Sequence, residues 1–134
     1  MDEKIVTSGK RKAAVARAMI KEGNGQIKIN KKGYQLLQIF DKLRMDEPIK
    51  IYEKVMGKLN IDADIFVHGG GEKSQVEAAR LALAKGMIKF SNSKELSKAF
   101  LNYDRNLLVA DVRRKEAYKP GDSKARRHRQ TSYR

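Results

Sequence analysis

Cysteine and tryptophan are absent from this chain of 134 residues, and proline occurs only twice. Without cysteine there is no disulfide framework and no thiol chemistry, a composition compatible with a reducing compartment. No apolar run approaches the roughly 20 residues that a membrane-spanning helix needs. The opening residues, MDEKIVTSG, lack the apolar stretch of a secretory signal. We therefore expect a cytoplasmic protein that binds no membrane.

Acidic side chains are also scarce, because 16 aspartates and glutamates face 30 lysines and arginines and leave a net charge of +14. Such an excess favours polyanionic partners, and it carries no information about the fold. The cations are concentrated in residues 113–134, which hold nine basic and two acidic side chains and so carry half of the net charge.

Residues 113–134 contain no Val, Ile, Leu, Met or Phe. Such a segment cannot bury enough apolar area to offset the entropy lost when its backbone is ordered. We predict a globular domain over residues 1–112 and an extended basic arm over 113–134, which becomes ordered against a nucleic-acid backbone. Tyr118 and Tyr133 are the aromatic residues of the arm, and they suit stacking on exposed bases.

The first thirty residues predict three consecutive antiparallel strands. Two strands are expected over Ile5 to Thr7 and Ala13 to Ile20, joined by the basic run Gly9-Lys10-Arg11-Lys12. Gly23-Asn24-Gly25 is typical of a hairpin turn, since Gly and Asn accept positive φ. The third strand follows over Gln26 to Asn30.

We expect mainly helices in the middle of the chain, interrupted by one strand. A short helix is predicted over Tyr34 to Phe40 and a longer one from Pro48, which suits a first helical position. Alternation over Leu59 to Val67 predicts a half-buried strand, and Ser74 with Glu77 forms a capping-box pattern for the next helix. The apolar stripes expected on the three longer helices are Ile49, Tyr52, Met56 and Leu59; Val76, Ala79, Leu83, Met87 and Phe90; and Leu96, Ala99, Phe100 and Tyr103, this last helix capped within Ser91 to Ser93. This order predicts an α+β fold with helices on one face of a small, mostly antiparallel sheet.

Gly69-Gly70-Gly71 joins the predicted strand to the predicted helix. The free amides of a helix start suit a phosphate group, and Lys73 and Arg80 add positive charge nearby. The alternative is that the glycines only permit a tight turn. Both interpretations stay open from the residues alone.

Catalytic and metal-binding patterns are weak. The glycines fit neither a Walker loop nor a dinucleotide fingerprint, and no Gly-x-Ser-x-Gly elbow accompanies His68 and the glycines as in esterases. The two histidines, His68 and His128, lie far apart without cysteine, so we predict no metal and no cofactor. Asp62 and Asp64 share one strand face, where a solvated face is more common than acid–base chemistry.

The basic run Lys10-Arg11-Lys12, with Arg17 beyond it, is the third cationic feature. Isolated basic runs are usually solvated surface. Together with the arm and the glycine loop, this run predicts one shared nucleic-acid-binding surface.

These motifs, in this order and spacing, resemble those of the universal ninth protein family of the small ribosomal subunit. The resemblance covers nearly the whole chain. It rests on Thr7 to Arg17; on Gly69-Gly70-Gly71 with Ser74, Gln75, Ala78, Arg80, Ala82, Ala84 and Lys85; and on Asp111, Arg113, Glu116, Lys124 to Arg127, Gln130, Ser132 and Arg134. The ending Ser132-Tyr133-Arg134 is similar to archaeal and eukaryotic members.

The resemblance implies a β-α-β core and a non-enzymatic structural role in the head of the small subunit, beside other ribosomal proteins. It implies binding to ribosomal RNA, and an arm that reaches the peptidyl-site tRNA during translation. The RNA-binding residues that we expect are Lys10, Arg11, Lys12, Arg17, Gly69, Gly70, Gly71, Lys73, Gln75, Arg80, Arg113, Arg114, Lys119, Lys124, Arg126, Arg127 and Arg129. Tyr133 and Arg134 are the residues expected to contact the tRNA.

Two alternatives belong to other classes. A free-standing DNA-compacting protein would share the charge, but it would not need the triglycine loop or the single arm. A small phosphate-binding enzyme would need a catalytic constellation, and none is evident in the sequence.

Overall fold

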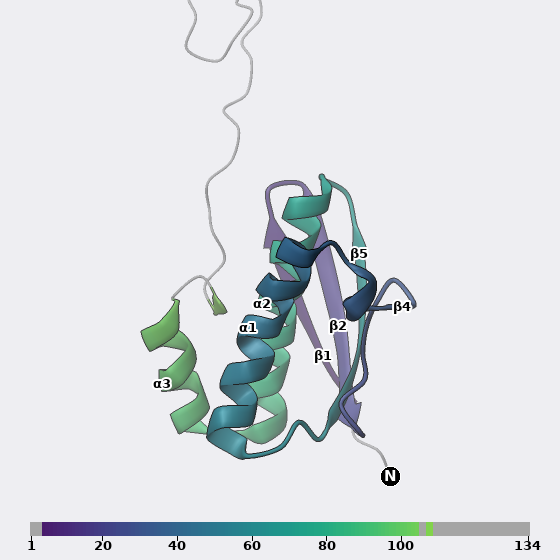
Figure 1. The fold of residues 1–134 in the computed structure, drawn as a ribbon. Helices are drawn as coiled ribbons and strands as arrows, with labels where there is room; N and C mark the ends of the chain where they lie inside the picture. The colour runs from purple at the N-terminus through teal and green to yellow at the C-terminus, as the bar shows by residue number, and fades with distance from the viewer. Residues whose placement is uncertain (1–3, 105–106, 109–134) are drawn as a thin grey trace, which may run out of the picture.

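The computed structural model describes residues 4–104 and 107–108, which form a layer of helices over one face of a sheet (Figure 1). The α+β class is therefore confirmed. The elements in chain order are β1 (Ile5–Arg11), β2 (Ala14–Glu22), β3 (Ile27–Ile29), β4 (Lys32–Gly33), the 3-10 turn η1 (Tyr34–Leu36), α1 (Ile39–Met56), β5 (Ile61–His68), α2 (Glu72–Ser91) and α3 (Lys94–Tyr103). The proposed arm, residues 113–134, lies outside the described residues, so the boundary near residue 112 stays a prediction.

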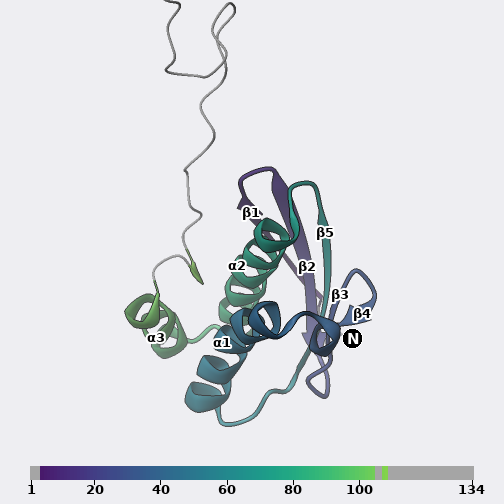
Figure 2. The ribbon, with the colours of Figure 1, turned by 45° about the horizontal axis from the view of Figure 1, so that its top comes forward.

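The sheet is mixed, with strand order β1-β2-β5-β3-β4. All neighbouring strands are antiparallel except β3 and β5, which run parallel and are connected through α1. This connection is the expected β-α-β unit. Strand β5 separates β2 from β3, as Figure 2 shows, so the prediction of three consecutive antiparallel strands is wrong at the third. The eight-residue β5 offers β2 a longer partner than the three-residue β3.

The turn from Gly23 to Gly25 is held by β5 and does not form a β2–β3 hairpin. The Oδ1 atom of Asp62 accepts hydrogen bonds from the backbone amides of Asn24, Gly25 and Gln26 at 3.0, 3.1 and 3.0 Å. These amides, chiefly that of Gln26, lower the pKa of the Asp62 carboxyl, because they stabilise its charged form. Asp62 is thus a structural residue that ties the turn after β2 to strand β5.

We expect Asp62→Ala to lower the free energy of unfolding by about 1–2 kcal/mol, the low end for charged hydrogen bonds because the turn is open to solvent. Asp64→Ala is the matched control, since Asp64 is exposed on the same face of β5. Denaturant unfolding over a pH series measures both. Because folding lowers the pKa of Asp62, its stabilising contribution is fully present at pH values above 3.8, the ordinary pKa of the carboxyl. The contribution is lost as the pH falls through the lower pKa that Asp62 has in the folded protein. Equal stability of the two variants at pH 7 would contradict this role.

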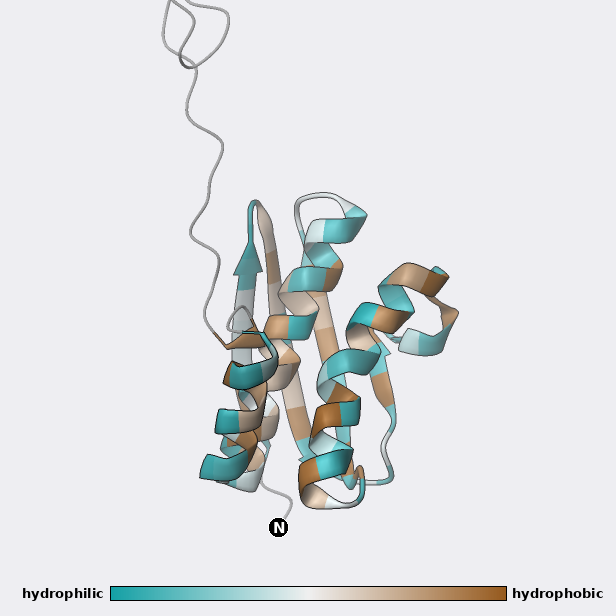
Figure 3. Ribbon diagram, turned by 60° about the vertical axis from the view of Figure 1, so that its left-hand side comes forward, coloured by the Kyte–Doolittle hydropathy of each residue, from teal (hydrophilic) through white to brown (hydrophobic). Residues whose placement is uncertain are grey.

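Helix α2 lies directly across β1, β2 and β5, α1 packs beside α2, and α3 packs against α1 (Figures 1 and 3). The alternating residues Ile61, Ala63, Ile65 and Val67 are buried as predicted. Of the stripe expected on α2, Val76, Ala79, Leu83 and Met87 are buried and Phe90 is half-buried. The helix also buries Ala78, Leu81, Ala82 and Ala84, because it is enclosed by the sheet and the other helices.

Helix α1 begins at Ile39, nine residues before the predicted start, and Pro48 lies inside it. A proline removes one backbone hydrogen bond, but here it is buried between the buried residues Met45 and Ile49, so packing holds the helix together. Of the short helix predicted over Tyr34 to Phe40, only the three-residue 3-10 helix η1 forms separately, and Ile39 and Phe40 already belong to α1. Met56 is exposed and Leu59 lies beyond the helix, so the predicted stripe is correct only at Ile49 and Tyr52.

The two helix starts after β5 differ. Gly71 precedes α2 without a side-chain cap, so the predicted capping box of Ser74 and Glu77 is wrong. The Oγ atom of Ser93 accepts a hydrogen bond from the Leu96 amide at 3.3 Å, as expected for the start of α3. Leu96 and Phe100 are buried, whereas Ala99 is half-buried and Tyr103 is exposed.

Candidate nucleic-acid interface

Two of the predicted cationic motifs meet at one end of the sheet. Strand β1 continues to Arg11, so the basic run lies mostly in the strand and the turn is made by Lys12 and Ala13. This corrects the prediction of a basic loop. In the β2–β5 ladder, Val15 pairs with His68, which brings the turn beside the triglycine loop. Figure 1 shows the turn and the loop at the same end of the molecule.

Gly69 and Gly70 are required by this contact. Their φ values are +77° and +65°, a region that disfavours side chains. A Cβ atom at Gly69 would lie 2.5 Å from the Ala13 carbonyl oxygen, and one at Gly70 would lie 3.0 Å from the Ala14 nitrogen. The glycines therefore let the loop pack on the β1–β2 turn, as the tight-turn interpretation requires.

Gly71 differs from its two neighbours, because a Cβ atom there would meet nothing within 4 Å and its φ is −94°. It precedes the amides that open α2, where the first two residues, the acidic Glu72 and the basic Lys73, are both exposed. The Nε2 atom of Gln75 donates to the Gly69 carbonyl oxygen at 3.1 Å and braces the loop. This geometry is compatible with phosphate binding as well as with a turn.

Four predicted cations of the folded body are exposed: Lys10, Lys12, Arg17 and Lys73. Lys10 pairs with Val15 across the β1–β2 ladder and Arg17 pairs with Ser8. Lys10 and Arg17 are therefore diagonal neighbours on the face of the sheet that carries no helix. The end of β1 is among the hydrophilic segments in Figure 3.

Arg11 and Arg80 face the interior. The Nε atom of Arg11 lies 2.6 Å from an oxygen of Glu77, and only 16% of the Arg11 side chain is exposed. The side chain of Arg80 is 13% exposed and forms ion pairs with Glu47 and, at 3.6 Å, with Asp104. Arg11 alternates with outward-facing Lys10, and Arg80 lies on the side of α2 that meets α1 and α3. Both arginines connect elements of the fold.

Two lysines of α2, Lys85 and Lys89, were not predicted as binding residues from the sequence. Together with Arg17 they line a hollow along β1. Their spacing of four residues places them on one side of the helix. The four-residue spacing of the two lysines is visible in the sequence, but only the position of β1 shows that this side of α2 borders the edge of the sheet.

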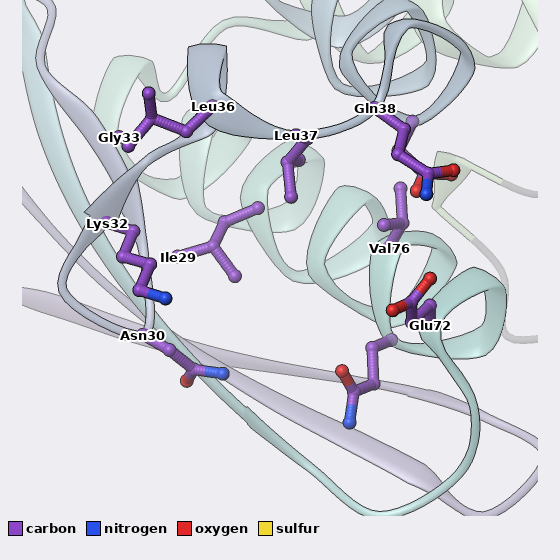
Figure 4. Close-up of a pocket in the computed structure, with 11 residues that line it drawn as sticks. Ile29, Asn30, Lys32, Gly33, Leu36, Leu37, Gln38, Glu72 and Val76 are labelled. Carbon is purple, nitrogen blue, oxygen red and sulfur yellow. The ribbon is translucent and has the colours of Figure 1, made fainter.

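A hollow of different character lies between β3, η1 and the starts of α1 and α2 (Figure 4). Its walls include Ile29, Leu36, Leu37 and Val76, with Lys32 among the polar residues near its rim. Asp41 and Glu72 also line it, so its charge is unsuited to phosphate. Phe40 of the neighbouring turn of α1 is 76% exposed.

The enzyme alternative gains no support from residues 4–104 and 107–108. Within them, no three His, Cys, Asp or Glu side chains gather to hold a metal ion. No helix in that part of the chain is long and apolar enough to cross a membrane.

The remaining predicted RNA- and tRNA-binding residues lie outside the described residues. They are Arg113, Arg114, Lys119, Lys124, Arg126, Arg127, Arg129, Tyr133 and Arg134.

A basic α+β domain, with a glycine loop packed against a lysine-bearing turn, is typical of proteins that bind nucleic acid. Comparison with known proteins identifies the family. Residues 9–134 match the family described as Ribosomal protein S9/S16. The chain is 46% identical over 133 residues to the small ribosomal subunit protein uS9 of Methanococcus vannielii. The aligned region covers 97% of this chain and 98% of that protein. The chain is 47% identical, with the same coverage, to the uS9 protein of Methanococcus maripaludis strain C7.

The chain therefore belongs to the ribosomal protein S9/S16 family. It is a structural constituent of the small ribosomal subunit, acts in translation in the cytoplasm, and is not an enzyme. Its partners in that subunit are ribosomal RNA and other ribosomal proteins. The family resemblance inferred from the sequence motifs is confirmed.

Proposed function

We propose that the folded body binds ribosomal RNA of the subunit head through the end of the sheet where β1 turns into β2. The observation that supports this most strongly is the packing of the triglycine loop on the Lys12–Ala13 turn. It brings Lys12, the open start of α2 and Lys73 to one end of the molecule. Cations and backbone amides there suit phosphate groups, which position a protein on RNA with little base recognition.

Arg11 and Arg80 enter this proposal as positioning residues. Each already has a carboxylate partner inside the body. Arg11 pairs β1 with α2, and Arg80 pairs α2 with α1. The two arginines hold in place the surface that carries Lys10, Lys12 and Arg17. Lys10, Lys12 and Arg17 supply the contacts with RNA.

We further propose that residues 113–134 extend from the body along ribosomal RNA, with Tyr133 and Arg134 at the peptidyl-site tRNA. The support is the nine cations of this segment, its lack of large aliphatic residues, and the family to which the chain belongs. A segment of this composition neutralises phosphates in a path too narrow for a folded domain.

Deletion of Arg134 tests the tRNA contact. We expect the variant to fold and to enter small subunits normally, because one terminal side chain contributes little to the core. Its subunits should release peptidyl-site tRNA about tenfold faster, the effect of losing one charged hydrogen bond. Filter binding of labelled tRNA to purified subunits measures the difference, and Arg134→Lys should restore part of the retention. Failure of the deletion variant to enter subunits, or unchanged tRNA retention, would contradict the assignment.

A further inference from the structure

A groove runs along the outer edge of β1, away from the triglycine loop. Its walls are Val6, Thr7 and Ser8 of β1, Arg17 of β2, and Lys85 and Lys89 of α2, and its volume is about 410 Å³. Lys73 is the second residue of α2, and Lys85 lies twelve positions further on, or about 18 Å along the helix axis. Lys85 and Lys89 therefore lie well away from the glycine loop, and Arg17 is the residue that borders both surfaces.

The charge of the groove has one sign. Three cationic side chains line it, and no carboxylate does so among the described residues. Arg17 and Lys89 are exposed, and Lys85 is half-buried. The Nζ atom of Lys85 lies 3.4 Å from the Ser8 carbonyl oxygen, which holds its ammonium group over the strand edge. Converging cations without acidic partners favour an anionic ligand.

The backbone of β1 adds hydrogen-bond donors along the same groove. Strand β1 stands at the end of the sheet order, with β2 on its other side. Ser8 directs its carbonyl oxygen toward Lys85 and so away from β2. In an antiparallel strand the N–H of a residue points to the same side as its C=O, and alternate residues repeat the direction. The amides of Val6, Ser8 and Lys10 therefore face the open edge.

We propose that this groove is a second RNA-binding site, in which Arg17, Lys85 and Lys89 hold consecutive phosphates of an RNA backbone along β1. The proposal rests on the RNA-binding function proposed above and extends it to residues outside the loop. Lys10 is a diagonal neighbour of Arg17 and continues the row of cations toward Lys12. The two sites thereby form one cationic path from the glycine loop along the side of the domain.

An unpaired edge strand is also a template for a strand from another protein. The lining of this groove favours RNA instead. A paired protein strand needs the backbone groups of β1 but not three cations, and Lys85 lies over one of the carbonyl groups that such a strand would need.

The double variant Lys85→Gln/Lys89→Gln tests the proposal in the full-length chain. Its matched control is Lys50→Gln/Lys54→Gln, which removes two exposed lysines at the same spacing from α1. Binding to a transcript of the small-subunit RNA head is measured between 50 and 300 mM salt. We expect the log–log salt slope of the groove variant to be shallower by about 2, near 1 for each lysine that no longer binds a phosphate. The control variant should keep the natural slope.

A charge-preserving variant, Lys85→Arg/Lys89→Arg, should retain the natural slope, which separates binding from a structural role of the lysine stems. Circular dichroism verifies that each variant is folded. Equal salt slopes for the groove variant and the natural chain would overturn the assignment of the groove as an RNA-binding site while leaving the proposed function intact. A natural chain whose RNA binding does not depend on salt would instead refute the proposed function. Unchanged RNA binding together with a protein strand cross-linked to Ser8 in subunits would favour the edge-strand alternative.

Discussion

Gly9→Ala is expected to destabilise the folded body by about 3 kcal/mol, at the upper end of the cost of overpacking a core. A Cβ atom at Gly9 would lie 2.4 Å from the Ala78 carbonyl oxygen and 2.8 Å from the Ala82 nitrogen. Both are backbone atoms of α2, so no side-chain rotation relieves the clash, and the helix must move away from β1. Because α2 covers three strands, the shift would disturb packing across the sheet.

Gly71→Ala is the matched control, because its added Cβ atom meets nothing within 4 Å and its backbone conformation suits any residue. Urea unfolding followed by circular dichroism compares both variants with the natural chain. We expect Gly71→Ala to stay within about 0.5 kcal/mol of the natural stability. Similar stabilities of the two variants would show that the close contact between β1 and α2 is not essential.

Removal of residues 113–134 is expected to have the largest effect on RNA binding. If about six of the nine cations contact phosphates, their removal makes the log–log salt slope shallower by roughly 4, at the coefficient for single strands. Over a fourfold rise in salt, the affinity of the complete chain should then fall roughly 250-fold more than that of the truncated one. Filter binding to a transcript of the subunit head measures both slopes.

A chain with residues 113–134 in shuffled order keeps the charge of the arm and serves as the control for composition. It should retain the slope, since phosphate contacts depend on charge, and it should lose tRNA retention if Tyr133 and Arg134 act by position. An unchanged slope after truncation would show that the body alone binds the RNA.

The alternating pattern in the sequence predicted the core face of β5 well. Every second residue from Ile61 to Val67 is apolar, and burial of that face is a local property of a strand. The order of the strands in the sheet could not be predicted in this way. The insertion of β5 between β2 and β3 depends on pairing between segments far apart in the chain, which no turn signal near Gly23 reveals.

Local rules also failed where tertiary contacts outweighed them. Pro48 suggested a helix start, yet it lies within a buried face that runs from Met45 to Tyr52. Glu77 suggested a capping box, but the guanidinium of Arg11 engages its carboxylate. Both outcomes follow from packing against another element, which sequence spacing cannot show.

The candidate site was predictable as a set of residue types more than as a surface. The motifs indicated which basic and glycine residues to consider, and the structure shows how those of the folded body lie relative to one another. Alternation along β1 places Lys10 on the outer face and Arg11 on the inner face, but this distinction requires the strand to continue to Arg11. The predicted strand ended at Thr7, so the sequence could not separate the two residues. Lys85 and Lys89 became candidates only because β1 is an edge strand.

Directed cleavage of RNA from Gly71→Cys in assembled small subunits would test the RNA-binding surface most directly. The natural chain has no cysteine, so a cysteine-linked iron chelate attaches at one position and the natural chain is the blank. Gly71 has open space for the added group, and Lys58→Cys, which precedes the opposite end of β5, provides a comparison. We predict strong cleavage of ribosomal RNA of the subunit head from position 71 and weaker cleavage from position 58. Cleavage from position 71 no stronger than the blank would contradict the proposed interface.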